Sequence, residues 1–261
     1  MIYARQPAGF ALGALGGSYP APAIGLPPAV GPAYWDEFVP DHGAKAKSLY
    51  GDMDWLETVI GSALTIQAIQ PTSYAEIGIL SCTTASAANR GGTLSQGSIA
   101  PLYRMPPVGS TFVCKVRITS GTTNYEFWSG FASSNANRVG VTNTTQFVGI
   151  RAVGGNLFGV YKSGAGVEST VDFGFSIEGT TWHQVGFEVI GTQAAPQVQF
   201  FKLSPNATDP EVWDREDVGT PRAGITISVG LFPIALGILT TDAVQKTAEI
   251  DYWAWGGRTA R

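Results

Sequence analysis

Short runs in which every second residue is apolar recur from about Asp54 to the end of the chain, and they constrain the fold more than any other feature. The clearest run covers residues 112–118, where Lys115 and Arg117 share one parity and four apolar residues share the other. Successive side chains of a strand point to opposite faces of a sheet, so this pattern predicts a strand with one buried face. Eleven segments show strand patterns: 64–69, 75–80, 111–119, 125–131, 146–152, 156–161, 166–171, 183–190, 197–203, 233–239 and 247–255.

Turn residues separate these runs, as at Gly154-Gly155 and Ser204-Pro205-Asn206. No helical apolar stripe of real length is present, apart from one turn's worth around residues 44–50. Many short strands at hairpin-like spacing predict an all-β fold, a two-sheet antiparallel sandwich or jelly roll. Residues 51–261 are therefore expected to form one β-sandwich domain.

Residues 1–50 differ from the rest, because seven prolines lie between Pro7 and Pro40 among many glycines and alanines. Proline removes backbone donors and holds the chain extended, so this segment is predicted to be an extended Pro/Gly-rich arm. It is too apolar for a solvated linker and should lie against its own domain or against a neighbouring subunit. The residues expected to anchor it are Phe10, Tyr34, Trp35 and Phe38.

Charge and ligand chemistry exclude several classes of function. Only 14% of residues are charged, the net charge is −4, and no cluster of Lys or Arg occurs, so nucleic acid is not an expected partner. No apolar run approaches the roughly 20 residues that span a bilayer, which excludes a membrane helix. Two isolated histidines and two cysteines form no recognised zinc set, and no cofactor is expected. Cys82 and Cys114 could be bonded to each other or free.

The second half of the chain resembles a known sandwich. The run Thr181-Trp182-His183-Gln184-Val185 resembles the strand that begins with Trp-His in concanavalin A-like lectin/glucanase domains. A strand like 198–202 follows it in those domains, and a strand like 248–255 closes them. The same order of strands is similar to sandwich domains of bacteriophage decoration, fibre and spike proteins. The resemblance covers about residues 111–256 and implies a concanavalin A-like jelly roll.

One motif raises the question of catalysis. Glucanases of this fold carry a Glu-x-Asp-x-x-Glu run, and Glu249-Ile250-Asp251 matches its first half. Retaining hydrolysis needs two carboxyl groups about 5–5.5 Å apart. The positions for the second Glu hold Trp253 and Ala254, so the proton donor is missing and the chain is predicted not to be an enzyme.

Strict alternation along the last strand suggests another use for it. Parity places Glu249, Asp251, Trp253 and Trp255 on one face, and the small or apolar residues between them on the other. An outer face with two Trp and two carboxylates could bind a glycan, form a subunit interface, or be covered by the arm through Tyr34 and Trp35.

Acidic residues crowd the segment 209–217, which is predicted to be a loop. Calcium binds clustered oxygen ligands, so a weak calcium candidate is formed by Asp209, Asp214 and Asp217. The spacing matches no EF-hand, and a solvated acidic loop is the alternative. No other metal site is expected.

Together these features predict a non-enzymatic structural protein of a bacteriophage particle, made in the host cytoplasm and displayed on the virion surface. It would serve as a capsid decoration or cement protein or as a short fibre. Its arm would bind other virion proteins, and it would form a homo-oligomer, with a trimer favoured. The alternative is a carbohydrate-binding module of a tail fibre or secreted protein, and a glycoside hydrolase is the third hypothesis.

Overall fold

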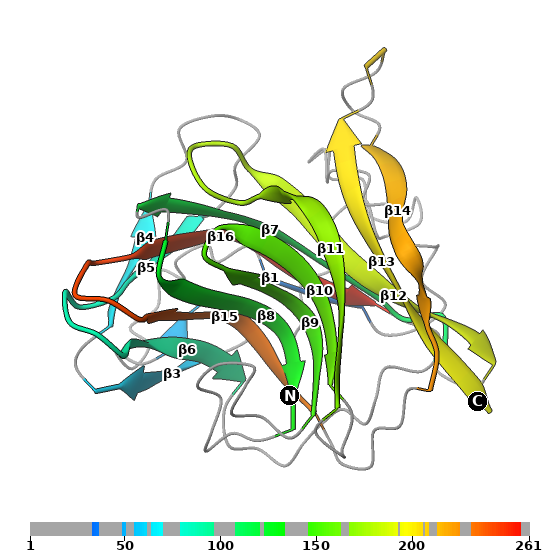
Figure 1. Cartoon of the computed structure of the whole chain (residues 1–261), viewed down its shortest axis with the longest axis horizontal. Coiled ribbons are helices and arrows are strands. Elements are labelled where there is room, and N and C mark those ends of the chain that lie inside the picture. The colour runs from blue at the N-terminus through cyan, green and yellow to red at the C-terminus, as the bar shows by residue number, and fades with distance from the viewer. Residues whose placement is uncertain are drawn as a thin grey trace, which may run out of the picture.

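The computed structural model describes residues 33–36, 49–50, 55–61, 64–69, 79–96, 108–120, 123–133, 146–162, 167–192, 194–205, 207–208, 213–224 and 231–256 (Figure 1). In these ranges every regular element is a strand. The strands are β1 (Ala33–Asp36), β2 (Leu49–Tyr50), β3 (Trp55–Ile60), β4 (Thr65–Ile69), β5 (Ile79–Thr83), β6 (Arg90–Gln96), β7 (Thr111–Ser120), β8 (Tyr125–Ala132), β9 (Phe147–Val153), β10 (Asn156–Lys162), β11 (Glu168–Ser176), β12 (His183–Thr192), β13 (Ala195–Pro205), β14 (Trp213–Arg222), β15 (Phe232–Thr240) and β16 (Thr247–Gly256).

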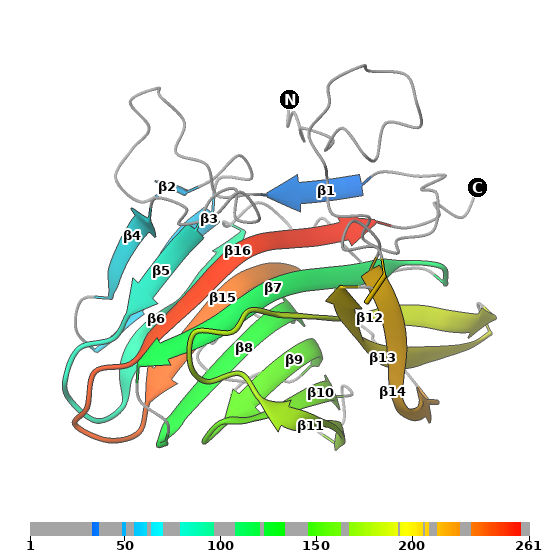
Figure 2. The same cartoon turned by 90° about the horizontal axis from the view of Figure 1, so that it is seen from above.

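The strands form two sheets that pack face to face (Figures 1 and 2). The first, here called the β16 sheet, has the order β14-β13-β12-β7-β16-β5-β4, with β1 also paired to β16. The second, the β8 sheet, has the order β11-β10-β9-β8-β15-β6-β3-β2. All paired strands in both sheets are antiparallel. The predicted all-β jelly-roll sandwich is therefore confirmed.

The core lies between the sheets and follows the predicted alternation. On β7, Phe112, Cys114, Val116 and Ile118 are buried in the main cluster, as expected from their parity. Phe112 lies against Phe131 of the opposite sheet, with ring centroids 5.9 Å apart. Burying a side chain of this size contributes about 1.5–3 kcal/mol. A continuous aromatic core thus joins the two sheets.

Each of the eleven predicted segments overlaps a strand, but three further long strands, β3, β6 and β14, were not predicted. In β6 the sequence Arg90-Gly91-Gly92 reads as a turn. The structure instead needs glycine there, because a Cβ on Gly91 would lie 1.9 Å from the carbonyl oxygen of Ile238 on β15. Close approach of two backbones, rather than a turn, explains this glycine.

The two cysteines are both buried and free, so the disulfide alternative is wrong. Cys114 lies in the core on β7, and burial raises the pKa of both thiols. Each therefore acts as a small apolar side chain.

Candidate functional site

Strand β16 carries the residues with the strongest functional signal, and its register against β7 is interrupted. Ile250 pairs with Val116, whereas Tyr252 pairs with Lys115, the next residue along β7. Asp251 is therefore the extra residue of a β-bulge, which leaves two residues of β16 opposite one of β7. The bulge reverses the relation between residue parity and sheet face from this point on.

The bulge moves the two tryptophans into the core. Trp253 is fully buried, with its ring 5.3 Å from that of Trp55 on β3, and its Nε1 donates a hydrogen bond to the Ile234 carbonyl at 3.1 Å. Trp255 is 6% exposed and lies against Phe131. The predicted outer face of Glu249, Asp251, Trp253 and Trp255 is thus wrong for both tryptophans. Tyr252 and Ala254, expected in the core, lie instead on the outer side with Val113.

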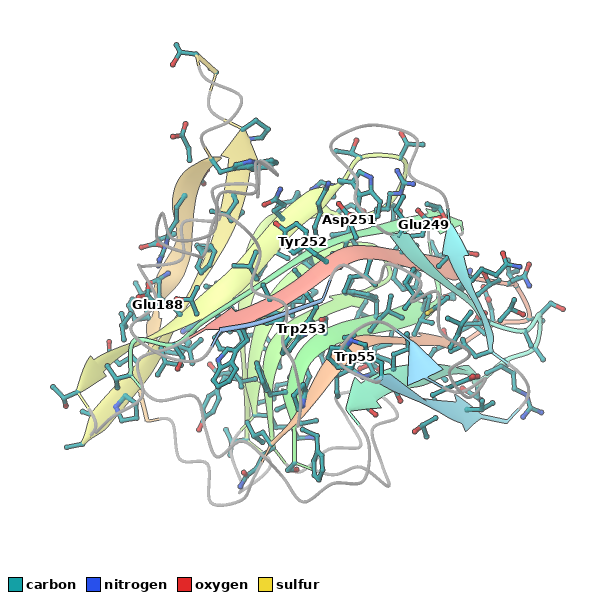
Figure 3. The ribbon with its side chains drawn as sticks, turned by 180° about the vertical axis from the view of Figure 1, so that it is seen from behind. Trp55, Glu188, Glu249, Asp251, Tyr252 and Trp253 are labelled. Carbon is teal, nitrogen blue, oxygen red and sulfur yellow. The ribbon has the colours of Figure 1, made fainter. Side chains whose placement is uncertain are left out.

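Glu249 and Asp251 lie side by side along β16 with Tyr252 (Figure 3). Both carboxylates lie on the outer side of the β16 sheet, and each is bound to a cation of β7. Lys115 Nζ donates to Asp251 Oδ2 at 2.6 Å, and Arg117 Nε donates to Glu249 Oε2 at 2.6 Å. Asp251 is 2% and Glu249 6% exposed. These are buried, charge-assisted hydrogen bonds between neighbouring strands.

Residues of β12 and of the segment before it complete this arrangement. The Tyr252 hydroxyl donates to Gln184 Oε1 at 2.5 Å, and burial raises the pKa of Tyr252. The Trp182 ring lies over the Arg117 guanidinium, 4.2 Å from the ring centroid. We call Lys115, Arg117, Gln184, Glu249, Asp251 and Tyr252 the polar row. The sequence predicted the outward parity of Lys115 and Arg117, whereas Trp182 and Gln184 were noted only in the run that resembles the Trp-His strand, and not as site residues.

The polar row is suited to holding strands together rather than to proton transfer. A glycosidase needs one carboxyl group that gives up a proton and a second that attacks or activates water. Here both carboxylates of β16 are held by cations, and both serve the fold. The described residues also contain no group of three His, Cys, Asp or Glu that could hold a metal ion.

The arm meets the sandwich at the same strand. β1 pairs antiparallel with the end of β16, with Tyr34 opposite Trp255, Trp35 opposite Ala254 and Asp36 opposite Trp253 (Figure 2). The preceding part of the same β16 edge, Thr247–Ile250, pairs with β5. Two of the predicted anchors, Tyr34 and Trp35, thus lie in a strand of the sandwich. The other two, Phe10 and Phe38, lie outside the described residues.

The prediction of an acidic loop is wrong for two of the three calcium candidates, because these two residues lie in a strand. Asp214 and Asp217 lie in β14, and Asp209 lies outside the described residues. Asp217 accepts a hydrogen bond from Arg215 at 2.8 Å, and Arg215 also donates to Glu188 of β12 at 2.6 Å. The charges of β14 therefore form surface ion pairs. β14 escaped prediction because it is the edge strand and has almost no buried face to create alternation.

Comparisons with known proteins agree with the fold. No protein-family model and no curated protein sequence matches this chain. Among solved structures, a pseudo β-1,3-glucanase of Mycobacterium tuberculosis has 12% identity, a TM-score of 0.53, and coverage of 86% of this chain and 98% of that one. The carbohydrate recognition domain of Emp47p has 13% identity, a TM-score of 0.50, and coverage of 87% and 96%. An endo-β-1,4-glucuronan lyase from the fungus Trichoderma reesei has 8% identity, a TM-score of 0.50, and coverage of 86% and 94%.

At such low identity these similarities show the fold alone. They confirm a lectin/glucanase-like jelly roll, as the Trp-His strand indicated. The described residues also contain no helix long and apolar enough to cross a membrane.

Proposed function

We propose that this protein is a non-enzymatic structural component of a bacteriophage particle. It is displayed on the particle surface as a capsid decoration or cement protein or as a short fibre. The observation that carries the non-enzymatic part is the pairing of Asp251 with Lys115 and of Glu249 with Arg117. The motif that raised the question of catalysis has a structural use instead.

Attachment through the arm is supported by the position of β1. This strand, residues 33–36 of the arm, pairs with the edge of β16. Residues 1–32 carry one charged side chain, Arg5, and they include Phe10 and Tyr19. An apolar segment of this kind binds another surface more favourably than it binds water. The expected partners are other virion proteins and further copies of this chain.

The test is the incorporation of truncated protein into particles. A variant lacking residues 1–32 keeps β1, so its sandwich should unfold at the same temperature as the full chain, and it should be missing from purified particles. A control in which Ala21, Ala23 and Ala29 are replaced by serine keeps the arm's length and its large apolar residues, and it should still be incorporated. Normal incorporation of the truncated protein would reject attachment through residues 1–32.

One observation favours a second candidate, a carbohydrate-binding module. Trp182 is partly exposed and lies over Lys115 and Arg117, and an aromatic ring beside polar groups is an arrangement that sugars can use. The original candidates for stacking, Trp253 and Trp255, are buried in the core and no longer support it. One structural neighbour is named as a carbohydrate recognition domain. A glycan array in which Trp182→Ala abolishes a signal of the full chain would favour this candidate.

A further inference from the structure

The β16 sheet ends at β4 on the side away from β14, and Figure 2 shows β4 at this edge beside β5. Strand β4 pairs with β5 over its whole length, from Thr65 opposite Thr83 to Ile69 opposite Ile79. In the described part of the chain, no strand pairs with the other side of β4. Alternate residues of an antiparallel strand direct their backbone N–H and C=O groups to opposite sides, so this side presents groups that a further strand can bind.

The other edge strands are protected, each in a different way. β14 carries Asp214, Glu216 and Asp217, and charged side chains hinder pairing with another chain. On β11, the Thr170 carbonyl accepts a hydrogen bond from Arg222 of β14 at 2.9 Å, so a side chain of β14 occupies a backbone acceptor of this strand. β2 has only two residues, and a short edge offers little to pair with.

β4 has none of these protections. Its sequence, Thr-Ile-Gln-Ala-Ile, contains no charged residue and no proline, and its register with β5 runs without a bulge. Thr65 and Gln67 are exposed. Ile66 is only partly buried, and it packs against the main core cluster at the border of the sandwich. Neutral side chains of high β-propensity beside free backbone groups favour pairing with another strand.

The partner that fits this edge is the same edge of a second copy. Two β4 strands related by a two-fold axis run antiparallel, so each supplies the backbone groups that the other lacks. With the axis at Gln67, Ile66 of one copy lies opposite Ala68 of the other, and Thr65 lies opposite Ile69. No charges meet in this pairing. A two-fold axis normal to the sheet also keeps the core faces of both copies on the same side.

We propose that two copies of this chain associate through β4, which joins their β16 sheets into one continuous sheet. The inference rests on the proposed function only in that both expect contacts between copies of this chain. Pairing through one such edge closes at two copies, so the predicted trimer would need a different surface. One pair of five-residue strands buries less than the roughly 1,200 Å² of a standard interface, so the dimer should dissociate on dilution.

The proposal can be tested by sedimentation of the isolated full chain, which should change from monomer to dimer as its concentration rises. Gln67→Lys places two like charges at the pairing axis, and Gln67→Glu does the same with the opposite sign. Each variant alone should associate about tenfold more weakly or less, because like charges are brought together. Since Gln67 is exposed, both variants should unfold at the same temperature as the unsubstituted chain.

A mixture and a control variant make the result specific. An equal mixture of Gln67→Lys and Gln67→Glu puts opposite charges across the axis and should restore association. Thr220→Lys adds the same charge to an exposed position of the β14 edge and should associate like the unsubstituted chain.

Three results would overturn the proposal: a full chain that stays monomeric at every concentration, a Gln67→Lys variant that associates as strongly as the unsubstituted chain, or a mixture that fails to associate. Since no particles are present, none of these results bears on the incorporation test of the proposed function.

Discussion

Strands β16 and β14 both carry charged side chains, but the two strands use charge in opposite ways. On β16, Glu249 and Asp251 are almost fully buried and are bound to cations of β7. On β14, at the edge of the same sheet, Asp214, Glu216 and Asp217 are exposed. A buried charge must be paired, since desolvation is costly, whereas an exposed charge contributes little to stability. The comparison teaches that the position of a strand in the sheet decides what its charges do.

Edge charges have a different use. An edge strand presents unpaired backbone groups that can pair with another chain, and charged side chains hinder such pairing. β14 has ten residues, and its side chains are exposed for most of that length. The four mutational predictions below test this difference between β16 and β14, in order of decreasing effect.

The largest effect on folding should come from changing the number of residues in β16 at or beside its bulge. Inserting one alanine between Tyr252 and Trp253 keeps the bulge but moves Trp253 and Trp255 to the outer face, so the protein should fail to fold cooperatively. Deleting Asp251 removes the extra residue and keeps both tryptophans in the core, so that variant should still fold. Circular dichroism in the near ultraviolet and a cooperative melting curve distinguish the two. Equal loss of folding in the insertion and the deletion variant would contradict the assigned bulge.

The next effect concerns the buried pair itself. Asp251→Ala leaves Lys115 buried without its carboxylate, and the free energy of unfolding should fall by about 3–5 kcal/mol. The double variant Lys115→Met with Asp251→Leu removes both charges and should lose much less. Urea denaturation measures both changes. A single variant that loses less than about 1 kcal/mol would mean that this pair behaves like a surface pair.

These two predictions also show where the sequence stops being informative. The alternation in residues 112–118 correctly predicted both the core face of β7 and the outward parity of Lys115 and Arg117. It could not predict their partners, because the ion pairs join residues more than 130 positions apart in the chain. The bulge at Asp251 lacks a glycine to mark it, so strict parity placed Trp253 and Trp255 on the wrong face. The prediction missed β14 for a different reason. A strand that is exposed on both faces has no alternation of apolar residues to detect.

A smaller loss of stability is expected when Arg215 is replaced. This residue of β14 pairs with Glu188 and Asp217 and lies over the Phe201 ring at 4.3 Å from its centroid. Arg215→Ala should lower the free energy of unfolding by about 1 kcal/mol or less, since these groups are partly exposed. Half of that loss or more should disappear in 1 M salt, where the Debye length is about 3 Å. A loss as large as that of Asp251→Ala would place Arg215 with the buried pairs.

The smallest effect on stability should come from the exposed charges of β14, although their effect on association should be the clearest. Replacing Asp214 and Glu216 by valine should change the free energy of unfolding by no more than about 0.5 kcal/mol. It should also promote aggregation, because a β-branched, uncharged edge is a template for pairing with another chain. Replacing the same two residues by lysine keeps the edge charged and serves as the control. Light scattering at rising concentration should increase for the valine variant and stay low for the lysine variant. If neither variant aggregates, the charges of β14 do not protect the edge, and the contrast with β16 is one of burial alone.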